Sequence, residues 1–191
     1  MGFFTETRIN IGNSILTKKA SRFTRKTYYR NFTGVRNIGI VWDASKTEEF
    51  AILSRFYQKM HDRNIDVTII AYFPGKELPD QYTAIRYLTC IRKDEINFFY
   101  LPVSPEADKF INIRFNILID INFRKIFPLT CISVLSRAGF KVGLLDKENN
   151  SDTFDLMMEL KRPINIEDYL TQVIHYLEMI NAEQKVKAET I

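Results

Sequence analysis

Hydrophobic residues along the chain fall into two recurring patterns, short continuous runs and stripes at helical spacing. Residues 35–41 form the first run, and residues 66–73 form the second. Between them lies a stripe at intervals of three and four residues, made by Phe50, Leu53, Phe56, Tyr57 and Met60. A continuous run is typical of a strand buried on both faces, and a stripe is typical of a helix that packs with one side. We therefore predict that residues 38–73 form a β-α-β unit with parallel strands.

Local signals mark both ends of the predicted helix. Ser45 and Glu48 have the spacing of a capping box, in which Ser45 accepts a hydrogen bond from the Glu48 amide. Asn64 follows the last turn, and asparagine tolerates the left-handed conformation in which helices often end. The helix is predicted to begin just after Ser45 and to end near Arg63.

A second unit follows with the same order of patterns. Residues 115–121 and 140–145 have strand patterns, and a short helix is predicted over 128–137 between them. A further strand is predicted over 154–160. Asn165 is placed to cap a last helix, whose apolar positions share one face and are Leu170, Val173, Ile174 and Leu177.

Residues 80–104, between the two units, give a mixed pattern. Residues 82–91 fit either a strand or a helix, and we predict extended structure for 86–91. Residues 97–101 fit a strand or the end of a short helix.

The pattern predicts an α/β protein, a three-layer Rossmann-like domain with a mostly parallel sheet and a basic N-terminal helical segment. The length of 191 residues suits one domain, and 46% hydrophobic residues exclude an intrinsically disordered chain. We place the basic segment at 1–36, packed on the body as a helix. The α/β domain is predicted over 37–182, with a frayed tail over 183–191.

Charge is distributed unevenly along the chain. Residues 1–36 contain eight Lys or Arg and one acidic residue, Glu6, which gives +7. The other 19 basic and 22 acidic residues give the rest of the chain about −3. Two interpretations stay open for the segment: its cations form the solvated face of a docked helix, or they bind a polyanion such as single-stranded nucleic acid. The sequence pI near 9.0 is therefore no sign of nucleic-acid binding by the whole protein.

The two cysteines and the absence of long apolar runs predict a cytoplasmic protein. Cys90 and Cys131 each lie inside an apolar run, so we expect buried thiols rather than a disulfide. No run approaches the roughly 18 apolar residues that a membrane span needs, and the N-terminus has no signal-peptide core.

Candidate ligand-binding residues follow two predicted strands. In an open parallel sheet, ligands bind at the carboxyl ends of the strands. The candidates there are Trp42, Asp43, Ser45, Lys46, Asp120, Asn122, Arg124 and Lys125. Asp43 and Asp120 could orient a hydroxyl group or hold a cation, or each could simply cap a turn. Lys46, Arg124 and Lys125 could bind a phosphate at a helix N-terminus.

Several common sites are not indicated by the sequence. Residues 42–46 contain no glycine, which disfavours a dinucleotide fingerprint and a P-loop. His61 and His175, the two histidines, have no ligand-spaced partner, and no nucleophile elbow is present. We therefore predict no metal site and no cofactor, and we assign no catalytic residue.

Three segments carry a resemblance to a known family: VRNIGIVWDA at 35–44, FNILID at 115–120 and LSRAGFKVG at 135–143. Together they resemble an uncharacterised family of small α/β proteins from Bacteroidota, which implies a domain of unknown function without established catalytic residues. Residues 115–143 are also similar to part of the acceptor half of heptosyltransferase-like glycosyltransferases. Those enzymes use two Rossmann-like halves, and a chain of 191 residues supplies only one.

Two functions remain after these exclusions. The first is a non-catalytic binding or interaction module that contacts a protein or a polyanion through residues 1–36. The alternative is an enzyme that acts on a sugar- or nucleotide-like substrate at the strand ends, with Asp43 and Asp120 as orienting or basic groups.

Overall fold

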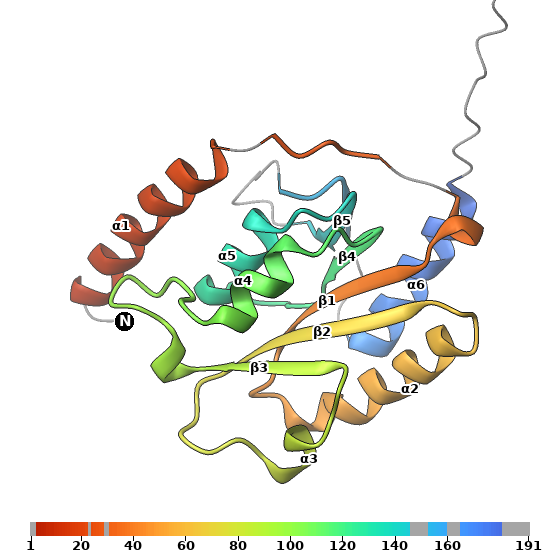
Figure 1. Cartoon of the computed structure of the whole chain (residues 1–191), viewed down its shortest axis with the longest axis horizontal. Coiled ribbons are helices and arrows are strands. Elements are labelled where there is room, and N and C mark those ends of the chain that lie inside the picture. The colour runs from red at the N-terminus through yellow and green to blue at the C-terminus, as the bar shows by residue number, and fades with distance from the viewer. Residues whose placement is uncertain (1–2, 23, 29–30, 146–152, 160–164, 181–191) are drawn as a thin grey trace, which may run out of the picture.

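Six parallel strands form one sheet in the order β3-β2-β1-β4-β5-β6 (Figure 1). The computed structural model describes residues 3–22, 24–28, 31–145, 153–159 and 165–180. The strands are β1 (Asn37–Asp43), β2 (Asp66–Phe73), β3 (Leu88–Arg92), β4 (Ile117–Asp120), β5 (Phe140–Leu144) and β6 (Leu156–Met158). Every pair of neighbouring strands is parallel. The predicted α/β class with Rossmann-like topology is confirmed.

Helices cover both faces of the sheet (Figure 1). On one face lie α2 (Phe50–His61) and α6 (Ile166–Met179), and on the other lie α4 (Pro105–Asn112) and α5 (Phe127–Leu135). The helix α1 (Phe3–Ala20) packs on the outside of α5, and α3 (Asp80–Thr83) is a single turn before β3. In the described part of the chain, no helix combines the length and the apolar character that crossing a bilayer requires.

Alternation along the central strands divides the core into two parts. Ile38, Ile40 and Trp42 of β1 point towards α2 and α6, and all three are fully buried. Val41, between them, points towards α4 and α5 together with Leu118 of β4. Because both faces of β1 and β4 are covered by helices, their sequences are apolar without alternation.

Two predicted helix boundaries are confirmed. Asn64 has φ of 57°, the left-handed conformation expected after α2. The side chain of Asn165 accepts a hydrogen bond from the Asp168 amide and so caps α6.

The predicted capping box at Ser45 and Glu48 is wrong. Lys46 occupies the N-cap of the first 3-10 turn (Thr47–Glu49), and no side chain caps it. The Ser45 hydroxyl instead donates to Asp43 at 2.6 Å. A nearby buried carboxylate competes successfully with the helix terminus for this hydroxyl.

The region between the two units also differs from expectation. Residues 97–101 form a turn rather than a strand or a helix end, and Tyr100 there has φ of 62°. The Asn97 side chain accepts hydrogen bonds from the amides of Phe99 and Leu101 and stabilises this turn. The helix α4, which starts at Pro105 after the capping residue Ser104, was not predicted. Extended structure near 86–91 is present as β3.

The helix α1 sits very close to the body of the domain. Leu16 is buried against Leu101, Phe127 and Cys131. At Gly12 a Cβ atom would lie 2.5 Å from the carbonyl oxygen of Phe99 and 2.8 Å from the ring of Phe127. Only glycine leaves room for this approach, so the position of α1 depends on the residue at 12. The predicted tail at 183–191 lies outside the described residues.

Candidate functional site

The chain reverses its direction of winding between β1 and β4, which are neighbours at the centre of the sheet. The strand order runs outward from β1 through β2 to β3, and outward from β4 through β5 to β6. Such a switch point is where ligands bind in open α/β sheets. The register pairs Val41 with Asp120, so Asp43 and Asp120 both lie at the carboxyl edge of this junction. Asp43 and Asp120, two of the candidate residues, thus lie at neighbouring strand ends, and their role in ligand binding stays a prediction.

Asp43 is buried there, with 3% of its surface exposed, and both of its carboxylate oxygens are engaged. Oδ1 accepts hydrogen bonds from the hydroxyl and the amide of Ser45, at 2.6 and 3.2 Å. Oδ2 accepts from Nε and Nη2 of Arg124, at 3.0 and 2.7 Å. Arg124 Nη2 also donates to the Ser45 hydroxyl at 3.1 Å. The loops that follow β1 and β4 are therefore joined across the switch point by one ionic network.

Asp120 is engaged in a second network beside the first. Its Oδ1 accepts from the amide of Asn122 at 3.0 Å and from Nδ2 of Asn122 at 2.6 Å. Its Oδ2 accepts from the hydroxyl of Ser133 in α5 at 2.6 Å. Burial raises the pKa of Asp120, and these three hydrogen bonds oppose that rise. Asn122 Nδ2 also donates to the carbonyl of Val41, whereas its Oδ1 is buried and accepts no hydrogen bond from the described residues.

Trp42 and Lys46 take other roles than ligand contact. Trp42 is fully buried among Phe50 and Tyr82, and its Nε1 donates to Glu49 Oε2 at 3.0 Å. Lys46 Nζ donates to the other oxygen of Glu49 at 3.1 Å and lies 5.1 Å from the centroid of the Phe123 ring. Including Trp42 among the ligand-contacting residues was wrong, because it lies in the core.

The three cations predicted to bind a phosphate differ in whether they already have an acidic partner. Arg124 is paired with Asp43 and Lys46 with Glu49, whereas Lys125 is exposed and has no ion-pair partner among the described residues. Both carboxylates at the switch point already accept hydrogen bonds on both oxygens. A general base needs an oxygen that can reach a substrate proton, and in this structure the oxygens of both carboxylates accept hydrogen bonds from the protein itself. No group of three or more potential metal-ligating His, Cys, Asp or Glu residues is found in the part of the chain that the structure describes.

The sequence interpretation missed the tyrosines beside these carboxylates. Tyr72 of β2 pairs with Asp43 in the sheet register, and burial raises its pKa, with Tyr100 and Asp43 adding to the rise. The Tyr169 hydroxyl in α6 donates to the carbonyl of Asp120 at 3.2 Å. Aligning 37–43 with 66–72 as parallel neighbours would have identified Tyr72, whereas nothing local in the sequence indicates Tyr169.

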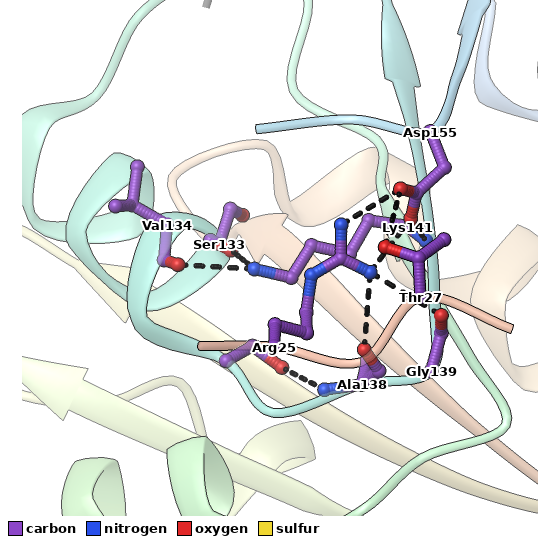
Figure 2. Close-up of polar contacts among 9 residues, drawn as sticks. Arg25, Thr27, Ser133, Val134, Ala138, Gly139, Lys141 and Asp155 are labelled. Carbon is purple, nitrogen blue, oxygen red and sulfur yellow. Dashed lines mark hydrogen bonds and ion pairs between the residues drawn. The ribbon is translucent and has the colours of Figure 1, made fainter. Parts of the chain in front are cut away.

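The basic N-terminal segment provides a second candidate surface. Arg8 lies over the rings of Phe98 and Tyr100, at 4.0 and 4.5 Å from their centroids. Arg25 forms a bidentate ion pair with Asp155, at 2.8 and 2.7 Å (Figure 2). Among the described residues, this is the only ion pair between the segment and the rest of the protein.

Besides Arg36, whose guanidinium donates to the carbonyls of Thr33 and Val35, four other cations of the segment are exposed and have no acidic partner among the described residues. They are Lys18, Lys19, Arg22 and Lys26, which we call the basic face. The helix packs through Leu16 and Gly12, and not through these charges. The cations are therefore not what attaches α1 to the acidic body.

Comparison with known proteins places the chain in a family. A family model described as "Family of unknown function (DUF6913)" matches residues 8–180. No curated protein matches the chain. The match confirms the expected resemblance to a family of unknown function, and it includes α1 as well as the α/β domain. The similarity to heptosyltransferase-like enzymes stays a prediction.

Proposed function

The chain belongs to this family of unknown function, and we propose that it is a non-catalytic binding module that holds an acidic segment of a partner protein on the basic face. One observation carries the proposal: Lys18, Lys19, Arg22 and Lys26 are exposed without acidic partners among the described residues, at the end of α1 and just after it, and the packing of α1 does not use them. Four uncompensated cations within nine residues attract anionic groups from solution.

The charge of the rest of the protein favours a short acidic segment over a long polyanion. Beyond residue 36 the chain carries about −3, so a nucleic acid that extended past the basic face would meet a repulsive surface. A short peptide segment with a few carboxylates can contact the four cations without extending onto the negatively charged surface around them. The engaged carboxylates at the switch point support a binding role over a catalytic one.

Fluorescence anisotropy with a labelled peptide of about twelve Asp and Glu residues tests this proposal. The variant replaces the basic face, as Lys18→Gln, Lys19→Gln, Arg22→Gln and Lys26→Gln. We expect a loss of affinity of about fourfold or more, because four exposed ion pairs of about 0.2–1 kcal/mol each contribute about 0.8–4 kcal/mol together.

A charge-matched control separates the basic face from net charge. It replaces four exposed cations elsewhere on the protein, as Lys76→Gln, Arg86→Gln, Lys93→Gln and Lys109→Gln. The proposal predicts near-native affinity for this control. Equal losses in both variants would refute a specific role of the basic face, and a single-stranded oligonucleotide bound more tightly than the peptide would reassign the partner to nucleic acid.

A further inference from the structure

Lys141 is a lysine buried in the core beside the N-terminal segment. It lies in β5 with 2% of its surface exposed. Its Nζ donates to the carbonyl oxygens of Ser133 and Val134, at 2.6 and 3.0 Å, at the C-terminal end of α5 (Figure 2). These two acceptors satisfy the two N–H groups of a neutral amine. An ammonium group has a third, for which no further acceptor is found among the described residues.

The strap, residues 24–28, is attached next to this lysine. Arg25 Nη1 donates to the carbonyls of Ala138 and Gly139, at 3.3 and 3.2 Å, in addition to its ion pair with Asp155. The Tyr28 amide donates to the same Gly139 carbonyl at 3.0 Å. Asp155 also accepts from the Thr27 hydroxyl and from the backbone amide of Lys141. One carboxylate thus links the strap to β5.

Arg25 and Lys141 are two basic groups beside that single carboxylate. The side chains of Arg25 and Asp155 are only 15% and 14% exposed, so water screens this cluster weakly. Burial, and to a smaller extent the charge of Arg25, lower the pKa of Lys141 to about 7, against the opposing effect of Asp155. Asp120 on β4 faces the same turn of α5 but binds the Ser133 hydroxyl, and the Tyr28 ring covers Gly139.

We propose that the strap is a proton-controlled latch, in which a proton on Lys141 releases Arg25 from Asp155, so that Arg25 becomes free to add its charge to the four cations of the basic face. The release of Arg25 is inferred only from the contacts among Arg25, Asp155 and Lys141. Its consequence for the acidic partner rests on the proposed function.

The direction of the pH dependence follows from linkage. In the proposed open state the charge of Arg25 has moved away and water is admitted to Lys141, so the pKa of Lys141 rises towards the ordinary value of 10.5. Above pH 7, opening therefore takes up a proton and becomes up to about tenfold less favourable with each pH unit. Below pH 7 the amine is charged in both states, and this dependence ends. The strap is released most easily at or below neutral pH and is held increasingly firmly above it.

Hydrogen exchange of the Tyr28 amide measures the latch without any partner. Between pH 7 and 8.5, its protection factor, corrected for the intrinsic exchange rate, is expected to rise by up to about 15-fold in the wild type, because at pH 7 the buried amine is already about half protonated. Lys141→Met, which keeps the length of the side chain but cannot titrate, is expected to show a constant protection factor. The Ile40 amide in β1 reports unfolding of the whole domain. Equal pH dependence in the two proteins, or exchange of Tyr28 no faster than that of Ile40, would overturn the latch.

A second variant keeps the test decisive if Lys141→Met does not fold. In Arg25→Gln the pKa of Lys141, followed by NMR at the carbon next to Nζ, is expected to rise above its wild-type value. An unchanged value would show that the two groups are not coupled.

Binding of the acidic peptide at pH 7 and 8.5 then tests the consequence for the partner. Weaker binding at pH 8.5 than at pH 7 is expected in the wild type and not in Lys141→Met. If exchange shows the latch but the peptide does not bind at either pH, the latch stands and the proposed function fails.

Discussion

Substituting Gly12 tests whether α1 is a fixed part of the domain. In Gly12→Ala the new Cβ would lie 2.5 Å from the Phe99 carbonyl oxygen and 2.8 Å from the Phe127 ring. The carbonyl belongs to the backbone, so the helix itself has to move. Overpacking of this kind costs about 1–3 kcal/mol, whereas the better helix propensity of alanine returns up to about 1 kcal/mol. For a docked α1 we expect a net loss of about 1–2 kcal/mol in the free energy of unfolding.

If α1 did not make this contact, Gly12→Ala would raise the free energy of unfolding, because only the gain in helix propensity would remain. Urea denaturation measures the free energy, and the labelling rate of the Cys131 thiol, which is buried under α1, reports undocking. Ser14→Ala on the exposed side of α1 is the control, with little change expected in either measurement. An increase in stability for Gly12→Ala, with unchanged Cys131 labelling, would refute the docked position.

Three further predictions concern single residues. Asn64→Ala is expected to destabilise the protein by about 1 kcal/mol in urea denaturation, because φ of 57° is unfavourable for alanine, while Asn64→Gly is expected to keep or raise stability. Arg124→Ala is expected to lower the free energy of unfolding by about 1–3 kcal/mol, since it leaves the buried Asp43 carboxylate without its cation. Arg124→Lys should recover most of that loss, and an unchanged urea midpoint for Arg124→Ala would contradict this cause. Burial of Cys131 and partial burial of Cys90 raise the pKa of both thiols to about 12, so at pH 8 both should react with a thiol reagent far more slowly than in urea. Equal rates would contradict this protection.

The regular part of the fold was readable from the sequence because its signals are local. Continuous apolar runs identified β1, β2, β4 and β5, since these strands are covered by helices on both faces. Asn64 and Asn165 act through neighbouring backbone atoms, so their roles depend only on adjacent residues. The helix α4 was missed because Ser104 and Pro105, which begin it, follow a segment with a mixed pattern.

The sequence places the candidate residues at the carboxyl ends of β1 and β4, where the structure has them, but it does not predict the hydrogen bonds among them, which depend on distant residues. The pairing of Arg124 with Asp43 spans 81 positions, and it takes over both the carboxylate and the Ser45 hydroxyl that local rules assigned to a helix cap. Lys141 gave no signal of burial either, because its environment is created by α5 and by Arg25 from the opposite end of the chain. Sequence spacing does not record such contacts.

One measurement bears most directly on the proposed role of the basic face, the salt dependence of acidic-peptide binding at constant pH. Anisotropy titrations between about 50 and 300 mM salt give the slope of log Kd against log salt concentration, which grows with the number of charged contacts. We predict a steep slope for the wild type and for the Lys76, Arg86, Lys93 and Lys109 control, and a shallow one when Lys18, Lys19, Arg22 and Lys26 are replaced by Gln. Equal slopes in all three proteins would show that the basic face does not hold the partner.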